Sequence, residues 1–489
     1  MSNRQKSILT ADADALRRAD DVVGRLGLPN EGIEVTDPGT AEVIAHVPDV
    51  GRDGITSMMA SADRAGASWA RTTPRERSNI LHRWWELLVE HSEDLALLIT
   101  REMGKTLAEA KGEVKYGSDF VRWYAEEAVR AGGNFQEAPD GGSRIVTRRS
   151  PVGLAVLITP WNFPLAMATR KIAPALAAGC SVVIKPATAT PLTTYFAVQL
   201  AREAGVPADL VHVITTSSSR TMSETALRDP HARKVSFTGS TEVGRTLLGL
   251  ASERVLRTSM ELGGNAPLLV FDDADLDRAV DGVFAAKMRN GGQSCIAANR
   301  IYVQDGIADD FVAAFRQKIA SVRMGHGLSE GAHLGPLVSS QAVTDMEAIV
   351  AGAISEGAEL LEGGNAPEGD GSFFSATLLD HVRPDSAISG SEIFGPIAAI
   401  QRFTTEEEAI QRANDTEFGL AGYVFTESLD RAFRVSDAIQ CGLVGINQGV
   451  PSNAAAPFGG VKQSGLGREG GSEGLEEYQN IRFYNIAAR

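Results

Sequence analysis

The sequence predicts an α/β protein built from two doubly wound α/β domains and a small β extension. Short β-branched runs alternate with helical patterns from about residue 150 onward, and this alternation favours a mostly parallel sheet. A second series of the same kind starts near residue 267 and continues to about residue 447. The chain has 489 residues, which is more than one hydrophobic core usually supports.

The first series defines the elements of one sheet and its helices. Strands are expected at 153–159, 181–185, 210–214 and 234–237. Helices are expected between and after them, at 165–178, 190–204, 220–228 and 242–251. Upstream, the first 125 residues are expected to hold two long amphipathic helices, near 54–71 and 76–91, which cover this sheet.

The second series repeats the pattern and leaves two extended segments outside it. Strands are expected at 267–271 and 300–304, with helices at 276–289 and 307–323. The segments 132–149 and 479–486 look like strands at the edges of the fold. Exposed strands commonly pair with another subunit, so a homodimer or homotetramer is expected.

The composition opposes several classes of function. A net charge of −15 and a pI near 5.1 disfavour binding to nucleic acid or to anionic membranes. The apolar runs are far shorter than the ~18 residues that span a bilayer, and the N-terminus lacks the apolar core of a signal peptide. Three widely spaced cysteines favour a reducing compartment, so a cytoplasmic protein is expected. The histidines show no metal-ligand spacing, and no metal is expected.

A cysteine in a polar, glycine-rich setting is the strongest chemical signal in the chain. Cys295 follows Gly-Gly-Gln-Ser, which is typical of an exposed thiol rather than of a core residue. Glu261 precedes the pair Gly263-Gly264, where backbone can approach a bound group. A thiol and a carboxylate of this kind indicate a nucleophile and a general base.

Three further segments have the features of binding turns. Lys185 ends a predicted strand, where α/β folds receive ligands, and it can donate to ribose hydroxyl groups. Gly239 and Ser240 follow another strand and open a helix, whose free amides can meet a pyrophosphate. Glu392 and Phe394 precede a Gly-Pro breaker and share one face if the segment is extended.

Asn162 lies between two prolines in Pro-Trp-Asn-Phe-Pro, on a turn that continues neither a helix nor a sheet. Its amide can donate to an oxyanion together with the backbone N–H of Cys295.

A rival interpretation is an NTPase. The segment 239–246 resembles a phosphate-binding loop and 268–272 resembles the acidic strand that follows one. Arg245 stands where such a loop needs the compact charge of a lysine, and this alternative gives Cys295 and Glu261 no role.

These motifs share their order and spacing with one family. They are 160–164 (Pro-Trp-Asn-Phe-Pro), 185–187 (Lys-Pro-Ala), 237–240 (Phe-Thr-Gly-Ser), 260–264 (Met-Glu-Leu-Gly-Gly), 292–295 (Gly-Gln-Ser-Cys) and 392–396 (Glu-Ile-Phe-Gly-Pro). With them the chain resembles the aldehyde dehydrogenase superfamily over nearly its whole length. The resemblance implies a dinucleotide-binding domain at 1–128 and 150–261, a catalytic domain at 262–447, and oligomerisation strands at 129–149 and 472–489.

The resemblance also implies roles for individual residues. Cys295 is expected to be the nucleophile, Glu261 to activate the deacylating water, and Asn162 to form the oxyanion hole with the Cys295 amide. Lys171 and Glu469 are candidates for a proton relay to the base. The expected dinucleotide contacts are Trp161, Asn162, Lys185, Pro186, Ala187, Thr188, Gly239, Ser240, Leu262, Glu392 and Phe394.

The expected substrate is an ω-oxo carboxylic acid. Arg170 and Arg289 are permanent cations suited to bidentate carboxylate recognition. With Ser452 they match the residues that hold the distal carboxylate in succinate-semialdehyde dehydrogenases, the subfamily that the chain most resembles. Glutarate semialdehyde stays open as an alternative, because one methylene changes discrimination by only ~1–3 kcal/mol.

One departure from relatives bears on the cofactor. Position 188 is Thr, where NAD-preferring relatives often carry a Glu whose charge repels a 2′-phosphate. NADP is therefore expected, with NAD possible. A non-catalytic scaffold is the remaining alternative, and it would be marked by loss of the nucleophile or base, both of which are present.

Overall fold

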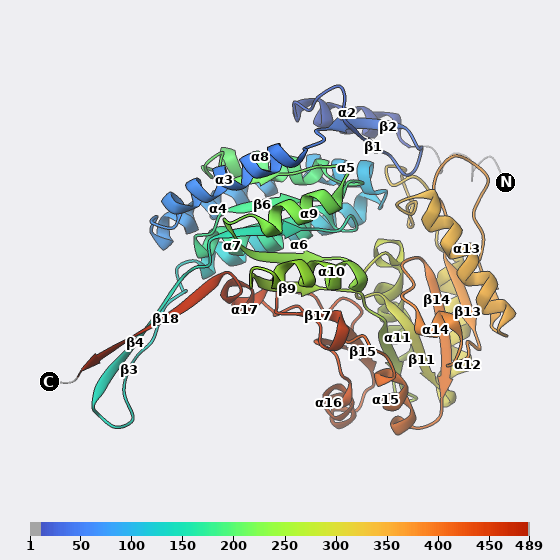
Figure 1. Ribbon diagram of the computed structural model, residues 1–489. Helices are drawn as coiled ribbons and strands as arrows, with labels where there is room; N and C mark the ends of the chain where they lie inside the picture. The colour runs from blue at the N-terminus through green and yellow to red at the C-terminus, as the bar shows by residue number, and fades with distance from the viewer. Residues whose placement is uncertain (1–10, 488–489) are drawn as a thin grey trace.

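Two largely parallel sheets organise the chain, and the computed structural model describes residues 11–487. Within these residues the strands form sheets of six, seven, three and two strands. Figure 1 shows the six-stranded and seven-stranded sheets in two lobes, with the three-stranded sheet projecting as an arm from the first lobe. The two doubly wound units and the β extension agree with the predicted fold class.

The six-stranded sheet has the order β17-β9-β8-β5-β6-β7. Its strands are β5 (Leu154–Ile158), β6 (Val182–Lys185), β7 (Val211–Val213), β8 (Ala232–Thr238), β9 (Arg257–Glu261) and β17 (Gly465–Leu466). The helices that connect its parallel strands are α7 (Pro164–Ala178), α8 (Leu192–Glu203), α9 (Ser219–Arg228) and α10 (Thr241–Ser252). The expected strands and helices of this series are all present, with ends shifted by three residues or fewer.

The strand order determines where ligands can bind. Strand β5 pairs in parallel with both β6 and β8, so the connections leave it in opposite directions. In open α/β sheets the crevice at such a switch point, outside the carboxyl ends of the strands, receives ligands. The Trp161-Asn162 turn follows β5 and the Gly239-Ser240 turn follows β8, so both motifs lie at this edge.

The N-terminal region is more helical than expected. Helices α3 (Arg52–Trp69) and α4 (Pro74–Glu90) match the two predicted ones. The structure adds α2 (Ala13–Arg25), α5 (Ser92–Met103), α6 (Leu107–Glu127) and a hairpin of β1 (Ile33–Thr36) and β2 (Val43–Val47). Every residue of α5 from Leu95 to Met103 is buried, so this helix has no polar face and no amphipathic pattern to reveal it.

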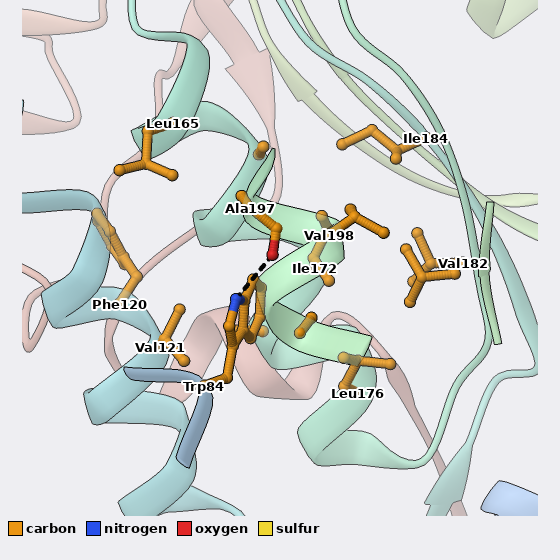
Figure 2. Close-up of a cluster of buried hydrophobic side chains, with 14 of the residues drawn as sticks. Trp84, Phe120, Val121, Leu165, Ile172, Leu176, Val182, Ile184, Ala197 and Val198 are labelled. Atoms are coloured by element: carbon orange, nitrogen blue, oxygen red, sulfur yellow. Dashed lines mark hydrogen bonds between the residues drawn. The ribbon is translucent and has the colours of Figure 1, made fainter. Parts of the chain in front are cut away.

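These helices bury one face of the first lobe in a continuous apolar core. Trp84 of α4 is fully buried, and its indole N–H donates to the carbonyl of Ala197 in α8 at 2.9 Å. Figure 2 shows this bond with Leu165 and Ile172 of α7 and Val182 of β6 around it. A buried indole needs such a partner for its N–H, and the contact fixes α4 against α8.

The seven-stranded sheet has the order β12-β13-β14-β11-β10-β15-β16. Its strands are β10 (Ala266–Val270), β11 (Ala298–Gln304), β12 (Glu359–Glu362), β13 (Thr377–Asp380), β14 (Ile397–Phe403), β15 (Ala421–Phe425) and β16 (Leu443–Ile446). The helices of this lobe are α11 (Leu276–Met288), α12 (Asp305–Ala320), α13 (Ser340–Ser355), α14 (Ala387–Gly390), α15 (Glu406–Asn414) and α16 (Leu429–Ala438). The predicted elements at 267–323 are all found here.

The arm consists of strands from two distant parts of the chain. Strand β4 (Ser143–Pro151) pairs with β3 (Phe135–Glu137) on one side and with β18 (Gln479–Ala487) on the other. Both predicted edge segments therefore belong to one sheet, whereas residues just before β18 form the short helix α17 (Gly471–Glu476). Apolar side chains of this sheet are exposed, among them Phe135, Ile481 and Phe483, each at 65–67%.

The C-terminal segment returns to the first lobe before it enters the arm. Strand β17 runs antiparallel to β9, with Gly465 opposite Glu261. A Cβ on Gly465 would lie 2.1 Å from the carbonyl oxygen of Met260, so only glycine allows this approach. The pairing brings the 465–469 segment next to the end of β9. Within residues 11–487, no helix combines the length and the apolar character that a bilayer span requires.

Candidate active site

The Cys295 loop has a backbone that its sequence makes possible. Between α11 and β11, residues Asn290, Gly291 and Gly292 adopt positive φ angles of 58°, 62° and 72°. A Cβ on Gly292 would lie 2.1 Å from the carbonyl oxygen of Gly395, so this position requires glycine. The Asn290 side chain closes the turn by donating to the carbonyl of Gln293 at 2.9 Å. The loop therefore carries Cys295 in a fixed position.

The Cys295 thiol is less accessible than the sequence suggested. The residue is half-buried and packs against the apolar core of the second lobe. Burial raises the pKa of the Cys295 thiol to about 12, although the positive charge of Arg170 opposes this shift. Glu261 and Glu392 raise it further. The free protein therefore holds a neutral thiol whose proton must be removed before the sulfur can attack.

Glu261 is a buried carboxyl group at the end of β9, on the same face of the site. It is 3% exposed, and its Oε2 atom has no hydrogen-bond partner among the described residues. Burial and the charge of Glu469 raise its pKa well above the ordinary value, and Arg170 and Lys171 oppose the shift. The backbone that follows Glu261 comes close to the Cys295 loop at Gly264. A Cβ at Gly264 would lie 2.4 Å from the Cys295 carbonyl oxygen, so this close contact requires glycine.

A buried ion cluster lies behind Glu261. Glu469 pairs through Oε2 with Arg170 Nε at 2.5 Å and through Oε1 with Lys171 Nζ. Lys171 also donates to Ser236 Oγ at 2.8 Å. Burial alone would raise the pKa of Glu469, but Lys171 and Arg170 outweigh it and lower that pKa. The structure therefore brings together the two residues predicted as a relay, beside the predicted base.

Asn162 lies next to the nucleophile loop. Its side-chain Nδ2 donates to the carbonyl of Gln293 at 3.1 Å, which leaves the second N–H of the amide for another acceptor. Its backbone carbonyl accepts from Lys105 Nζ at 2.8 Å and from Asn290 Nδ2 at 3.1 Å. Lys105 in turn pairs with Glu113, whose other oxygen accepts the first N–H groups of α7. Sequence reasoning missed Lys105 and Glu113, because the distant side chains that they contact come together only in the fold.

The predicted dinucleotide turns lie along the carboxyl edge of the first sheet. Lys185 ends β6, is 7% exposed, and has one hydrogen bond, a donation to the Pro186 carbonyl at 3.3 Å. Ala187 and Thr188 are half-buried beside it. Burial lowers the pKa of Lys185. Its remaining N–H groups can therefore donate to a ligand.

The second turn precedes a helix of twelve residues. Ser240 is the N-cap of α10 and accepts from the N–H of Val243 at 3.4 Å. Gly239 lies over the Phe237 ring, which a Cβ would approach to 2.4 Å. Leu262 is buried against Gly244 in the first turns of α10. The start of a helix, with glycine and serine on its surface, suits a phosphate group.

Arg245, which stands where the phosphate-loop alternative requires a lysine, donates to the side chain of Gln463. This contact directs its guanidinium group toward another part of the chain.

Glu392 and Phe394 reach the first lobe from the loop before β14. The segment is not a strand, so they do not share one extended face as the sequence suggested. Instead, Glu392 Oε1 accepts the N–H of Gly264 at 3.2 Å, and Phe394 meets Trp161 edge to face with ring centroids 5.4 Å apart. The two lobes therefore meet through the residues that were predicted to bind the dinucleotide.

A cavity of about 270 Å³ lies on the side of the nucleophile loop where Arg289 projects. Its lining includes Arg289, Ser452, Tyr116 and Phe163. The Arg289 guanidinium lies 5.1 Å from the centroid of the Phe163 ring, and no described residue forms an ion pair or hydrogen bond with it. Arg170 does not line this cavity. It is paired with Glu469 and packs against the Phe458 ring at 4.4 Å.

The described residues contain no cluster of three or more His, Cys, Asp or Glu side chains that can hold a metal ion.

The sequence and the fold match known proteins over most of the chain. The profile of the aldehyde dehydrogenase family matches residues 28–484. Succinate-semialdehyde dehydrogenase of Paenarthrobacter nicotinovorans is 50% identical, covering 91% of this chain and 99% of that protein. Glutarate-semialdehyde dehydrogenase of Pseudomonas putida is 47% identical, covering 93% and 94%. The crystal structure of an NADP-dependent enzyme of Escherichia coli superposes with a TM-score of 0.92 at 46% identity, covering 94% of this chain and 95% of that one. The chain belongs to the aldehyde dehydrogenase family.

Proposed function

We propose that this protein oxidises succinate semialdehyde, or a closely similar ω-oxo carboxylate, to the dicarboxylate with NADP⁺ as the oxidant. The observation that carries the proposal is the cavity beside the Cys295 loop, in which Arg289 forms no ion pair with a described residue, while the carboxylates Glu109 and Glu113 on the same lining stand beside Lys105. A permanent cation that is half-buried and unpaired is suited to a carboxylate brought by the substrate. Relatives named for succinate and for glutarate semialdehyde support the same substrate class.

The substrate pocket also limits the shape of the aldehyde. Phe163 and Tyr116 pack against the guanidinium of Arg289, with its carbon 5.1 Å and 6.0 Å from their ring centroids. Ser452 lies on the same wall and can donate its hydroxyl to the carboxylate. Glutarate semialdehyde is the second candidate, because a half-open pocket discriminates poorly against one extra methylene.

In the proposed chemistry Cys295 supplies the nucleophile. Its thiol gives its proton to water, and the resulting thiolate attacks the aldehyde carbon to form a C–S bond. The carbonyl oxygen becomes an oxyanion that accepts from the free N–H of the Asn162 amide and from the Cys295 backbone N–H. In well-studied hydrolases each such donor is worth about 3 kcal/mol. Arg170 stabilises the thiolate electrostatically, because its charge already opposes the upward shift of the thiol pKa.

Glu261 supplies the base for the second half of the reaction. The thioester on Cys295 is hydrolysed when Glu261 takes a proton from water and directs the hydroxide onto the acyl carbon. A carboxyl group with a raised pKa is better matched to this task near neutral pH than an ordinary one. Lys171 and Glu469 form the ion pair through which the proton can leave toward Ser236. Release of the dicarboxylate restores the free thiol.

The residues along the edge of the first sheet fit a dinucleotide. The N-terminus of α10 with Gly239 and Ser240 can bind a pyrophosphate, and Lys185 has N–H groups to spare for the ribose. When bound, NADP⁺ accepts the hydride that converts the Cys295 adduct into a thioester. The neutral side chain of Thr188 introduces no charge that repels a 2′-phosphate, and the similar Escherichia coli structure is that of an NADP-dependent enzyme.

We also propose that the arm pairs with a second copy of the chain. Exposed apolar side chains lie on both of its edge strands, with Ile481 and Phe483 on β18 and Phe135 on β3. Pairing of β18 or β3 with another subunit would bury them in a homodimer or homotetramer.

The three cysteines are free, in keeping with the reducing cytoplasmic compartment expected from the sequence.

The test is an absorbance assay for NADPH with a panel of aldehydes of equal chain length, with and without a terminal carboxylate. The proposal requires that kcat/KM be at least tenfold higher for succinate semialdehyde than for butanal, and that NADP⁺ be reduced. Equal turnover of charged and uncharged aldehydes would contradict the substrate class. Absence of NADP⁺ reduction with every aldehyde would contradict the activity itself, with the Cys295→Ala variant as the background control.

A further inference from the structure

Lys287 is a buried amine that the proposed mechanism does not use. Burial lowers its pKa to about 7, and the charge of Glu392 opposes that shift. It lies near the end of α11, eight residues before Cys295, and its side chain is fully buried. Three other buried lysines, Lys105, Lys171 and Lys234, each have a carboxylate within 4 Å, whereas Lys185 at the dinucleotide turn has none among the described residues. Lys287 has no such partner among the described residues, and both of its hydrogen-bond acceptors are uncharged. Because burying an unpaired ammonium is costly, its place in this core calls for a reason.

Its hydrogen bonds belong to a closed ring that joins the Gly264 turn, strand β11 and the Glu392 loop. Lys287 Nζ donates to Asn299 Oδ1 at 3.0 Å and to the carbonyl of Ile393 at 3.2 Å. Asn299 Nδ2 donates to the Gly264 carbonyl at 3.4 Å, and the Gly264 N–H donates to Glu392 Oε1 at 3.2 Å. Glu392 and Ile393 are neighbours in the chain, so the ring is complete.

The ring connects the segments that carry Glu261, Cys295 and Glu392, whose relative positions matter for the reaction. Gly264 lies three residues after Glu261 and against the Cys295 carbonyl. Asn299 lies at the start of β11, four residues after Cys295. Glu392 belongs to the loop that also presents Phe394 to Trp161. Lys287 links β11 to the Glu392 loop on one side of the ring, and Gly264 links the same two segments on the other.

We propose that Lys287 is a positioning residue for cofactor binding, which holds the Glu392 loop against the Gly264 turn so that the Glu392 carboxylate is ready for a ribose hydroxyl. This inference rests on the proposed dinucleotide-dependent activity. The electrostatics agree with the geometry. Burial raises the pKa of Glu392 to about 7, and Lys287 and the Gly264 N–H oppose that rise, so the lysine favours the carboxylate form that accepts hydrogen bonds.

The test measures cofactor binding directly and leaves catalysis aside. Lys287→Met should raise the Kd for NADP⁺, measured by calorimetry, about tenfold, which corresponds to the loss of one charge-assisted hydrogen bond. The rate at which iodoacetamide alkylates Cys295 without cofactor should stay within twofold of the wild-type rate. Lys234→Met is the matched control, because Lys234 is also fully buried but pairs with Glu477 at 3.4 Å. Its NADP⁺ Kd should stay within twofold.

A double-variant cycle separates positioning from general damage. If Lys287 acts through Glu392, Lys287→Met should have almost no further effect on Kd in a Glu392→Gln background. Full additivity of the two effects would overturn the inference, and so would an unchanged Kd in Lys287→Met alone.

A second variant keeps the inference testable if Lys287→Met does not fold. Asn299→Asp keeps an oxygen acceptor for Lys287 and removes the donation to Gly264, and its carboxylate gives the ammonium a charged partner. It should raise Kd for NADP⁺ in the wild-type background and not in Glu392→Gln; an effect that is absent, or equal in both backgrounds, would overturn the inference. If the unaltered protein failed to bind NADP⁺ at all, the proposed function would fall instead, so the two failures are distinguishable.

Discussion

Replacing Arg289 by Met tests the basis of substrate recognition, because it removes a cation and keeps an apolar stem of similar length. The guanidinium lies beside the Phe163 and Tyr116 rings and forms no ion pair among the described residues, although Glu109 and Glu113 line the same cavity. A hydrogen bond to a charged group contributes about 1.5–3 kcal/mol. At 1.4 kcal/mol per factor of ten, the variant should lose about 10- to 100-fold in kcat/KM for succinate semialdehyde.

The comparison with an uncharged aldehyde gives the prediction its specificity. Butanal brings no carboxylate, so its kcat/KM should change by less than about threefold in the same NADPH absorbance assay. Arg289→Lys should fall between Met and the wild type, since it keeps the charge and loses the planar fork. Equal losses for succinate semialdehyde and butanal would refute the carboxylate role and would indicate a damaged nucleophile loop.

Three further predictions concern the base, the oxyanion turn and the cofactor. Glu469→Gln should move the acid limb of the pH–kcat profile to lower pH, because Glu469 raises the pKa of Glu261; a limb that moves upward would contradict this. Lys105→Met should destabilise the fold by about 3–5 kcal/mol in urea unfolding, because it leaves Glu113 buried and unpaired; a loss below about 1 kcal/mol would count against it. Thr188→Glu should shift the ratio of kcat/KM values toward NAD⁺ by at least tenfold, and an unchanged ratio would show that position 188 does not face the 2′-phosphate.

Much of the fold could be predicted from local patterns. The β-branched runs before Asn162, Lys185 and Gly239 were correctly predicted as strands, because each is short, apolar and followed by turn residues. Helix α5 was missed because every residue from Leu95 to Met103 is buried, so this part of the helix has no exposed side. Helices α2 and α6, in contrast, place buried and exposed residues at helical spacing, so their signal was present in the sequence and was overlooked.

The types of residue in the site could be predicted from the sequence, but many of the contacts between them could not. Glu261, Cys295 and Asn162 lie in neighbouring turns, where their motifs suggested that they would act together. The pairing of Arg170 with Glu469 was not expected, because the partner comes from the C-terminal segment that returns beside β9. Lys287 had no signal at all. A lysine at the end of a helix is normally solvated, and the partners of Lys287, Asn299 and Ile393, come from distant segments of the second lobe that meet only in the fold.

The identity of the nucleophile is tested most directly by the Glu261→Gln variant. In that protein the deacylating base is lost, so an acyl group formed on the sulfur should accumulate. After a single turnover with succinate semialdehyde and NADP⁺, mass spectrometry of the quenched protein should find a succinyl group on the peptide that contains Cys295, in an amount equal to the NADPH formed. NADPH formation without any acyl group on Cys295 would contradict the account.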